Sequence, residues 1–482
     1  MLREVKHMKF AMSFFSILAL IITGTLFFQY HAYSSDLETG NGEFRYSQEI
    51  EIVYRENSLD IRQHFKNLPN QKVKIEWPEN AINPSCFIDN EKSCDRLSKE
   101  VSYFNKGETK SQSVSYIIPI KGGLQDKMLI QNAFATLTNG ESSYSVVHIS
   151  TDSKTVGQWV TGLPLVGQQK LSLVNYTMFS GYGTVRDIYW QTGNLKVQEQ
   201  TPVLSIYAPG AISKDFLKAL ENFKFLNDQH IAIIQEKNPV KEHDDRLLFL
   251  PELTEQAVEQ EVILSQIKSQ YKFKDSPTWL PEVVASYLVK DMIGSDKAKK
   301  IVKTLKEYMT ANQESTWQEA LNKLGEEPIS TASMDELLSE VLDAKTSYFK
   351  LNAAQENGTY PLLFEDERSV YVNDVLKKDV RVILYEGQVL YNADKLLPYL
   401  GYTAGEGENG YYINSDNRTF RFPKEPGFYV FNQRRYSTIS APIIKIANNY
   451  YVEEAWLQRL FLVELQKSDG RINIKLLTQE QE

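Results

Sequence analysis

Residues 276–287 have the sequence SPTWLPEVVASY, and they carry the clearest helix start in the middle of the chain. Pro281 suits the first turn of a helix, and Glu282 is a favourable acid near a helix N-terminus. The apolar side chains recur at helical spacing and can form one buried face: Trp279, Leu280, Val284 and Tyr287. The stretch therefore predicts a helix that belongs to a packed helical region.

The pattern from residue 212 to residue 350 is helical on both sides of this stretch. Ser213 and Thr254 are residue types that cap helix N-termini, and apolar side chains follow each of them at helical spacing. Ser333 begins a capping box before another apolar run, so a last helix is expected over residues 334–349. The range predicts one helical domain.

Two β-rich regions flank the helical one, at residues 46–211 and 366–478, with a linker expected at 351–365. Their β-branched and aromatic side chains alternate between glycine and asparagine turn signals. The second region repeats itself at an offset of 61 residues, so that Ile383 matches Ile444. One unit cannot bury its apolar face alone, so two units are expected to pack into one domain.

Each repeat unit is expected to contain a strand, a tight turn, a second strand, a short helix and a hairpin. The turns are expected at residues 386–387 and 448–449, and the helices at residues 393–399 and 454–461. These assignments predict two copies of one supersecondary unit.

An uncharged stretch near the N-terminus, FAMSFFSILALIITGTLFF at residues 10–28, predicts a transmembrane helix. As a helix it spans about 28 Å, close to the thickness of the bilayer's hydrocarbon core. The preceding charges are basic and the following ones acidic, which places residues 1–9 in the cytoplasm. Residues 10–30 are then an uncleaved signal anchor in the cell membrane, residues 31–45 are a linker, and the bulk of the chain is extracellular.

A cleaved signal peptide is the alternative, since Ala32 and Ser34 could form a small-residue cleavage site. The apolar run is longer than the roughly 7–15 residues usual in a signal peptide, which favours the anchor. A buried soluble helix fits less well, because the run has a basic flank and is not amphipathic. The anchor and the signal peptide both place the rest of the chain outside the cytoplasm.

Composition narrows the class of protein. The 482 residues are too many for one ordinary core and indicate roughly two to four domains. The formal net charge of −9 argues against nucleic acid as a partner, because phosphate binding needs a basic surface. Cys86 and Cys94 are expected to form a disulfide outside the cytoplasm. Two unpaired thiols are the alternative, and a zinc site would need two further ligands nearby.

The side chains that usually carry chemistry form no catalytic motif. No two of the six histidines have metal-ligand spacing, and His243 is expected in a solvated polar loop. Glu255, Glu259 and Glu261 could bind a hard cation together with Glu282, but exposed helix carboxylates are the simpler interpretation. The sequence contains no serine nucleophile elbow, P-loop or dinucleotide-binding glycine motif, so no cofactor or metal is expected.

The repeat at residues 366–478 resembles the stalk domain named after the N-terminal domain of copper amine oxidases, which is common in secreted and membrane-anchored proteins of Gram-positive bacteria. Its two units are VILYEGQVLYNADKLLPYLGYTAGEGENGYYIN and IIKIANNYYVEEAWLQRLFLVELQKSDGRINIKL. Where the family has Val-Pro-Leu-Arg at the helix start, this sequence has LYNADKL and YVEEAWL. The resemblance implies a stalk module without metal ligands, and so without copper.

Tyrosines crowd this C-terminal region. Aromatic rings on an exposed sheet face would suit contacts with a cell-wall glycan or an envelope protein, because they combine a large apolar face with a polar tip. Half-buried strand positions are the alternative explanation.

The helical middle resembles the gluzincin, or peptidase MA, zinc-peptidase fold through the segment Trp-Leu-x-Glu-x-x-Ala-x-Tyr at residues 279–287. In that family the glutamate, here Glu282, is the third zinc ligand. The preceding helix should carry His-Glu-x-x-His, and here it has ELTEQAVEQEVILSQI, which contains no histidine. The two missing ligand positions fall near Glu259 and Ile263, and an isoleucine cannot bind zinc. The resemblance implies a degenerate peptidase-like domain whose vestiges of the zinc-peptidase segment are Glu259, Trp279, Glu282 and Tyr287. The alternative is that residues 279–287 are simply the core face of an ordinary helix.

These features predict an α+β multidomain protein with an N-terminal transmembrane helix, a β-rich domain, a helical degenerate gluzincin-like domain and a duplicated β-rich stalk-like domain. The expected function is non-catalytic, as a binding or scaffold protein of a bacterial cell envelope. Its expected partners are the membrane and a cell-wall glycan or envelope protein, with no nucleic acid. The alternatives are an extracytoplasmic hydrolase with an unrecognised site, and a membrane-bound regulator that acts through a partner.

Overall fold

The computed structural model describes residues 44–88, 94–237, 246–324, 327–355, 358–425 and 427–477. Contacts between residues divide the chain into two compact units, Met1–Gln266 and Ile267–Glu482, so the protein is multidomain. The expected transmembrane segment at residues 10–30 lies outside the described residues, as does His243. Within the described stretches, no helix is both long enough and apolar enough to cross a membrane.

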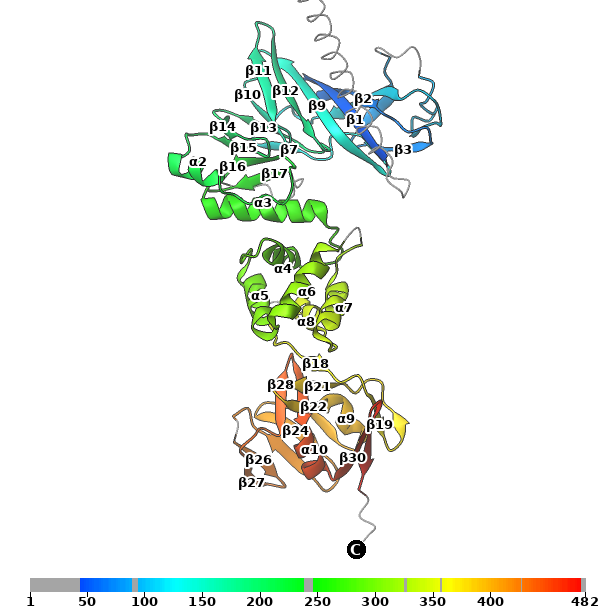
Figure 1. The fold of residues 1–482 in the computed structure, drawn as a ribbon, viewed down its shortest axis with the longest axis vertical. Helices are drawn as coiled ribbons and strands as arrows, with labels where there is room; N and C mark the ends of the chain where they lie inside the picture. Colours follow the sequence, from blue (N-terminus) through cyan, green and yellow to red (C-terminus); the bar gives the residue numbers. More distant parts are fainter. Residues whose placement is uncertain are drawn as a thin grey trace, which may run out of the picture. The chain divides into compact units, whose positions relative to one another are not determined.

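The largest sheet of the first unit has seven strands and one outward-facing side (Figure 1). Ile50 and Ile52 of its central strand are buried, whereas Glu49 and Glu51 point to the other face, as expected for a sheet with one wet side. β1 and β9 pair in parallel, and the other neighbours are antiparallel. The strand order is β11 (Leu165–Lys170), β12 (Val174–Tyr182), β9 (Gly140–Asp152), β1 (Phe44–Arg55), β2 (Ser58–Lys66), β6 (Ser111–Pro119) and β4 (Ile82–Cys86).

Two three-stranded sheets pack with the buried side of this sheet. Their apolar residues, among them Ile75, Ile130 and Trp190, belong to the same core cluster as Ile50 and Ile52. The strands are β10 (Gly157–Thr161), β13 (Ile188–Thr192) and β7 (Met128–Ile130) in one sheet, and β5 (Tyr103–Phe104), β3 (Val73–Glu76) and β8 (Thr136–Leu137) in the other.

A four-stranded sheet completes the first unit, and two helices cover one of its faces. Phe216 of α2 and Val258 of α3 pack against Ile206 and Ile233 of the sheet. The elements are β14 (Lys196–Gln200), β15 (Leu204–Ala208), α2 (Lys214–Leu220), β16 (Ile231–Gln235), β17 (Leu247–Leu250) and α3 (Glu255–Gln270). β15, β16 and β17 pair in parallel. Residues 212–350 therefore contain two strands besides helices, and the short apolar runs IAIIQ and LLFL are typical of buried parallel strands.

The second unit begins with five helices (Figure 1). They are α4 (Trp279–Leu288), α5 (Asp296–Tyr308), α6 (Ala311–Asn322), α7 (Thr331–Leu342) and α8 (Tyr348–Ala353). The expected last helix over residues 334–349 is wrong in its bounds, because Ser330 rather than Ser333 is the N-cap of α7. The helix ends where Asp343 adopts a left-handed conformation with a φ of 50°, and α8 is a separate helix.

Three sheets and two helices form the C-terminal part of the second unit. One sheet has the order β18 (Phe364–Glu365), β21 (Val382–Tyr385), β22 (Gln388–Asn392), β29 (Asn449–Glu453) and β28 (Ile443–Ile446). The second has the order β20 (Val375–Leu376), β19 (Ser369–Val372), β31 (Arg471–Leu476) and β30 (Val463–Ser468). The third is a meander of β23 (Thr403–Gly407), β24 (Gly410–Asn414), β25 (Thr419–Phe422), β26 (Phe428–Phe431) and β27 (Arg434–Ser437).

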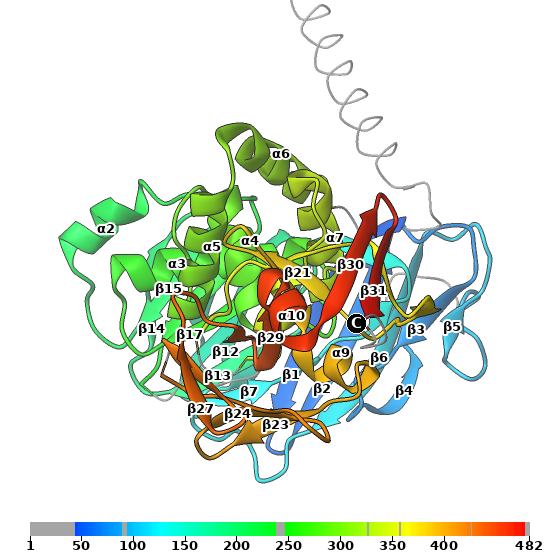
Figure 2. The ribbon, with the colours of Figure 1, turned by 90° about the horizontal axis from the view of Figure 1, so that it is seen from below.

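The elements of this part recur along the chain. β28 begins 61 residues after β21, at Ile443 against Val382, and α10 (Glu454–Phe461) begins 61 residues after α9 (Ala393–Tyr399). β22 pairs with β29, so the two repeat units share one sheet, and both helices pack against this pair of strands. Figure 2 shows α10 next to β29. The turn expected at residues 448–449 is wrong by one residue, because Ile446 pairs with Asn449 and leaves residues 447–448 as the loop.

Candidate functional site

Glu282 lies in the first turn of α4, and its carboxylate binds the start of the next helix. The Oε2 atom accepts hydrogen bonds from the backbone N–H of Ser295, at 3.0 Å, and from its hydroxyl, at 2.5 Å. Ser295 is itself the N-cap of α5 and accepts a bond from the N–H of Ala298. Gly294, with a φ of 86°, passes so close to Glu282 that a Cβ atom there would collide with its side chain. The residue at the family's third-ligand position is thus a capping group that joins α4 to α5.

Glu259 and Ile263, the positions that correspond to the two missing histidine ligands, lie on α3. Ile263 is buried, and the Oε1 atom of Glu259 lies 3.5 Å from the backbone N–H of Lys224. Farther along the helix, the buried side chain of Gln266 accepts a hydrogen bond from the N–H of Leu226. These contacts hold α3 within the first unit, whereas α4 belongs to the second.

Trp279 and Tyr287 are packed in the core of the helical region. Trp279 is 6% exposed and stacks on Phe349, with 6.3 Å between the ring centroids. Tyr287 is 1% exposed and meets the ring of Trp317 edge-on at 6.0 Å. Burial raises the pKa of the Tyr287 phenol well above its usual range. Both side chains therefore contribute to packing between helices.

The described stretches contain no group of three or more His, Cys, Asp or Glu side chains placed to hold a metal ion. A serine–histidine contact does occur, since the hydroxyl of Ser205 lies 2.9 Å from Nε2 of His230. Nδ1 of His230 lies 2.9 Å from the carbonyl oxygen of Pro202. Ser205 is fully buried and His230 is 3% exposed, so a substrate has no access to the hydroxyl, and the pair is a structural contact.

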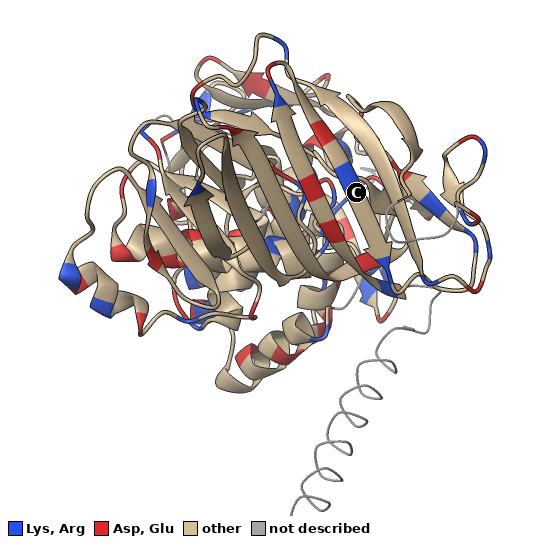
Figure 3. Cartoon of the chain, turned by 90° about the horizontal axis from the view of Figure 1, so that it is seen from above, with Lys and Arg blue, Asp and Glu red and all other residues tan. Residues whose placement is uncertain are grey.

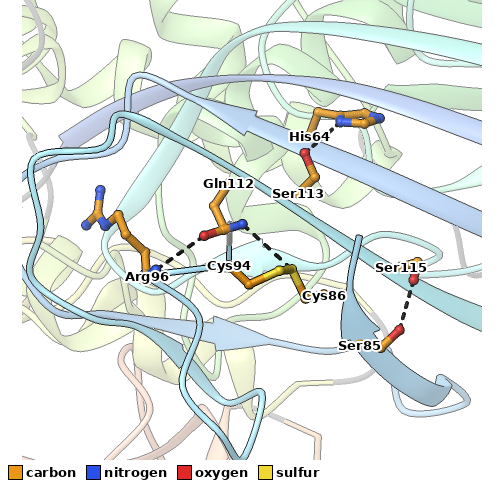
Figure 4. The surroundings of a disulfide bond; sticks show 8 residues. All are labelled: His64, Ser85, Cys86, Cys94, Arg96, Gln112, Ser113 and Ser115. Carbon is orange, nitrogen blue, oxygen red and sulfur yellow. Dashed lines mark hydrogen bonds between the residues drawn. A yellow bond between two sulfur atoms is a disulfide. The ribbon is translucent and has the colours of Figure 1, made fainter. Parts of the chain in front are cut away.

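Cys86 and Cys94 form a disulfide, as the sequence predicts, with 6.3 Å between their Cα atoms (Figure 4). Two residues later, the side chain of Arg96 is buried and donates hydrogen bonds to four backbone carbonyl groups, which belong to Pro69, Gln71, Asn105 and Thr109. Gln112 connects the two features, because its amide oxygen accepts from the backbone N–H of Arg96 and its amide nitrogen lies 3.9 Å from the Cys86 sulfur. Charge-assisted bonds thus hold the chain on either side of the bridge, and no sequence motif indicates this use of Arg96.

A chain of polar side chains crosses the outward face of the seven-stranded sheet, where charges of both signs follow the central strands (Figure 3). The Tyr176 hydroxyl lies 2.5 Å from Nδ1 of His148, and Nε2 of His148 lies 3.2 Å from Glu49. Glu49 accepts a 2.8 Å hydrogen bond from Lys66, which lowers the pKa of its carboxyl. The four residues come from β12, β9, β1 and β2, so only the strand register brings them together. Because each charged group has a partner, the array stabilises the sheet face.

The first unit contains a cavity of about 620 Å³, which we call the β7 groove. It is lined by residues 76–80, 118–120 and 128–132 together with Phe134, Thr136 and Arg186. Buried apolar residues contribute to the lining: Pro78, Ile118, Ile120, Ile130 and Phe134. The charged residues of the lining are exposed: Glu76, Glu79 and Arg186. No sequence motif marks this site, because its three backbone segments meet only in the folded chain.

The tyrosines of the C-terminal region are divided between core and surface. Tyr391, Tyr411 and Tyr451 are buried, whereas Tyr436 is 40% exposed and stacks on Tyr429 at 5.4 Å. The crowding of tyrosines in the sequence therefore arises in part from core positions.

No protein-family model matches this chain, and no curated protein matches it. Among solved structures, a mutant of an M1 zinc metallopeptidase from Deinococcus radiodurans aligns over 66% of this chain and 95% of its own, at 11% identity and a TM-score of 0.40. Another structure of the M1 zinc metallopeptidase from that organism aligns over 62% of this chain and 90% of its own, at 11% identity and a TM-score of 0.37. A two-domain M1 zinc metallopeptidase mutant bound to L-arginine also aligns over 62% of this chain and 90% of its own, at 10% identity and a TM-score of 0.37. Scores of this size do not establish the fold or the activity of this chain.

Proposed function

We propose that this chain is a membrane-anchored, non-catalytic binding or scaffold protein of a bacterial cell envelope. Its bulk lies outside the cytoplasm, its helical region is a peptidase-like domain without a zinc site, and its C-terminal part is a stalk-like module. The apolar stretch at residues 10–28, with its basic flank, supports the anchor. The resemblance of residues 366–478 to stalk domains supports the envelope.

The observation that carries the non-catalytic part is the engagement of Glu282. A carboxylate that serves as a third zinc ligand presents at least one oxygen atom to the metal, beside two imidazoles from the preceding helix. Here one oxygen atom accepts both hydrogen bonds from Ser295 at the start of α5. The helix that should supply two imidazoles has a buried isoleucine at one of these positions. A side chain in this arrangement organises helices rather than a metal.

The disulfide supports an extracytoplasmic location. Disulfides persist in oxidising compartments and are rare in the cytosol. Cys86 and Cys94 are the only cysteines of the chain, and they are joined to each other. An exported ectodomain accounts for this pairing.

Zinc analysis tests the non-catalytic proposal. The full-length chain, purified in detergent, would be incubated with zinc, freed of unbound metal and analysed by mass spectrometry, and then assayed with aminoacyl-coumarin substrates. We expect far less than one zinc per chain, and no hydrolysis above that of a Glu282→Gln control. Stoichiometric zinc or hydrolysis that the control loses would overturn the proposal.

Topology is tested separately by expressing the chain in intact bacterial cells. We expect a membrane-bound, full-length chain whose ectodomain is accessible to added protease, and a chain released in shortened form would contradict the anchor. A substitution that interrupts the apolar stretch, Leu18→Arg, should release the chain from the membrane or prevent export, since a central arginine costs roughly 3 kcal/mol on insertion. Leu18→Ala, which keeps the stretch apolar and leaves its flanking charges unchanged, is the matched control.

A further inference from the structure

We propose that the β7 groove binds an extended peptide with basic side chains, by adding it as a strand beside β7. This inference rests on the proposed function as a binding protein and supplies its site and its class of ligand.

The lining of the groove consists of runs of consecutive residues. Residues 128–132, 76–80 and 118–120 each line it without interruption. Successive side chains of an extended chain point to opposite faces, so side chains alone would give an alternating pattern of lining residues. In β7 the run covers the whole strand, so the strand borders the cavity along its length. The other two runs offer less backbone, because Ile118 already pairs with Leu59 and the N–H of Ile120 donates to Asn57.

β7 is the strand that can accept a neighbour. In its three-stranded sheet it pairs with β13 on one side only, through Ile188 with Ile130 and Trp190 with Met128. Among the described strands nothing pairs with its other edge, and an open edge is the structural template for strand addition. β7 offers this edge over the three residues Met128–Ile130, all of which line the groove. The edge ends there, because the N–H of Asn132 donates a 2.8 Å hydrogen bond to Asp187.

The remaining lining suits alternating side chains of a bound strand. Ile118, Ile120 and Phe134 provide apolar contact below the rim. Trp77 is half-buried, and its ring is fixed by a 2.8 Å hydrogen bond from its N–H to the carbonyl group of Val101. A peptide strand that pairs with β7 would direct every second side chain toward these residues and the others away.

The charges at the rim select the sign of the ligand. Glu76 and Glu79 lie on one wall segment and are exposed, and Arg186 is the single cation of the lining. Glu76, which lines the groove, accepts a 3.1 Å hydrogen bond from the hydroxyl of Thr138. Two carboxylates against one guanidinium give an excess of negative charge, which favours lysine or arginine side chains on the peptide.

Peptide binding is tested by fluorescence anisotropy with the full-length chain in detergent. The probe is a labelled heptapeptide of alternating lysine and valine. Three comparison peptides isolate the two parts of the proposal: two carry N-methyl groups on alternate residues, one in each register, and the third has glutamate in place of lysine. We expect one of the two methylated peptides to bind roughly tenfold or more weakly than the other, because only one register removes the hydrogen bonds to β7. The glutamate peptide should also bind roughly tenfold or more weakly, because its charge is reversed.

Protein variants place the site. Glu79→Lys should weaken binding of the lysine–valine peptide by roughly tenfold. Glu221→Lys makes the same charge change at an exposed residue of the first unit outside the groove lining, and it should leave binding unchanged.

Each other outcome overturns the proposal. If the lysine–valine peptide does not bind, or if the chain binds a chitin oligosaccharide instead of the peptide, a basic peptide is not the ligand. Equal binding of the methylated peptides in both registers removes strand addition, equal binding of the glutamate peptide removes the charge preference, and indifference to Glu79→Lys removes the groove. The zinc measurement is independent of all of these results, so the failure of this inference is distinguishable from the failure of the proposed function.

Discussion

His230 is an imidazole that the first unit keeps neutral. Nδ1 lies against the Pro202 carbonyl oxygen, which can only accept, so Nδ1 carries the proton and Nε2 is the acceptor that faces Ser205. Burial lowers the pKa of His230 from 6.5 to about 4, and the nearby Arg246 guanidinium acts in the same direction. The free energy of unfolding therefore depends on pH, because His230 has a lower pKa in the folded state than in the unfolded state.

We predict that the first unit loses stability as the pH falls from about 6.5 to about 4. In this window the unfolded chain protonates His230 while the folded one does not, so the loss reaches about 3 kcal/mol. His230→Gln, which keeps hydrogen-bonding capacity without titrating, should flatten this part of the pH profile. Urea unfolding at several pH values measures the difference between the two proteins. If the free energy of unfolding falls equally steeply with pH in wild type and variant between pH 4 and 6.5, His230 is not the group responsible.

The α4–α5 junction belongs to the scale of elements. Because Glu282 binds the residue that caps α5, the two side chains act as one capping unit. We predict that Glu282→Ala and Ser295→Ala each lower the free energy of unfolding of the second unit by about 1 kcal/mol. The double variant should lose less than the sum, since the two changes remove shared hydrogen bonds. Tryptophan fluorescence during urea unfolding measures the cycle, and strict additivity would show that the side chains act independently.

The disulfide stabilises another element, the segment beside β4. We predict that replacing both cysteines, Cys86→Ser with Cys94→Ser, lowers the free energy of unfolding by roughly 2–3 kcal/mol through the entropy of the unfolded loop. A reducing agent should lower the thermal midpoint of the wild type to that of the variant and leave the variant unchanged. A further effect of the reducing agent on the variant, which has no cysteine, would show that its action does not pass through this bridge.

At the scale of the whole molecule, the two repeat units are expected to fold together. Val452 is fully buried and pairs with Tyr391 where β29 of the second repeat unit meets β22 of the first repeat unit. We predict that Val452→Asp costs about 3 kcal/mol or more, because it buries a charge, and that amide protection falls together in β21, β22, β28 and β29. Val375→Asp, at a residue that is 56% exposed, is the control and should have little effect. Loss of protection confined to β28 and β29 would mean that the two repeat units fold separately.

Local signals in the sequence determined the features that depend on near neighbours. Ser213 caps α2 by accepting from the N–H of Phe216, and Thr254 accepts from the N–H of Ala257 at the start of α3. The pairing of Cys86 with Cys94 follows from two nearby cysteines in an exported chain. A capping bond spans three residues, and an eight-residue separation leaves few alternatives, so the residues themselves carry this information.

Only the tertiary structure decided which distant segments meet. The apolar runs of β16 and β17 are too short to distinguish a buried strand from a helix, and their parallel pairing with β15 settles it. Glu282 could be read as a vestigial ligand or a helix acid, and its contact with Ser295 comes from the path of the loop through Gly294. The β7 groove exists because three segments converge on it. Strand register and loop path are set by packing over the whole unit, which no short stretch of sequence contains.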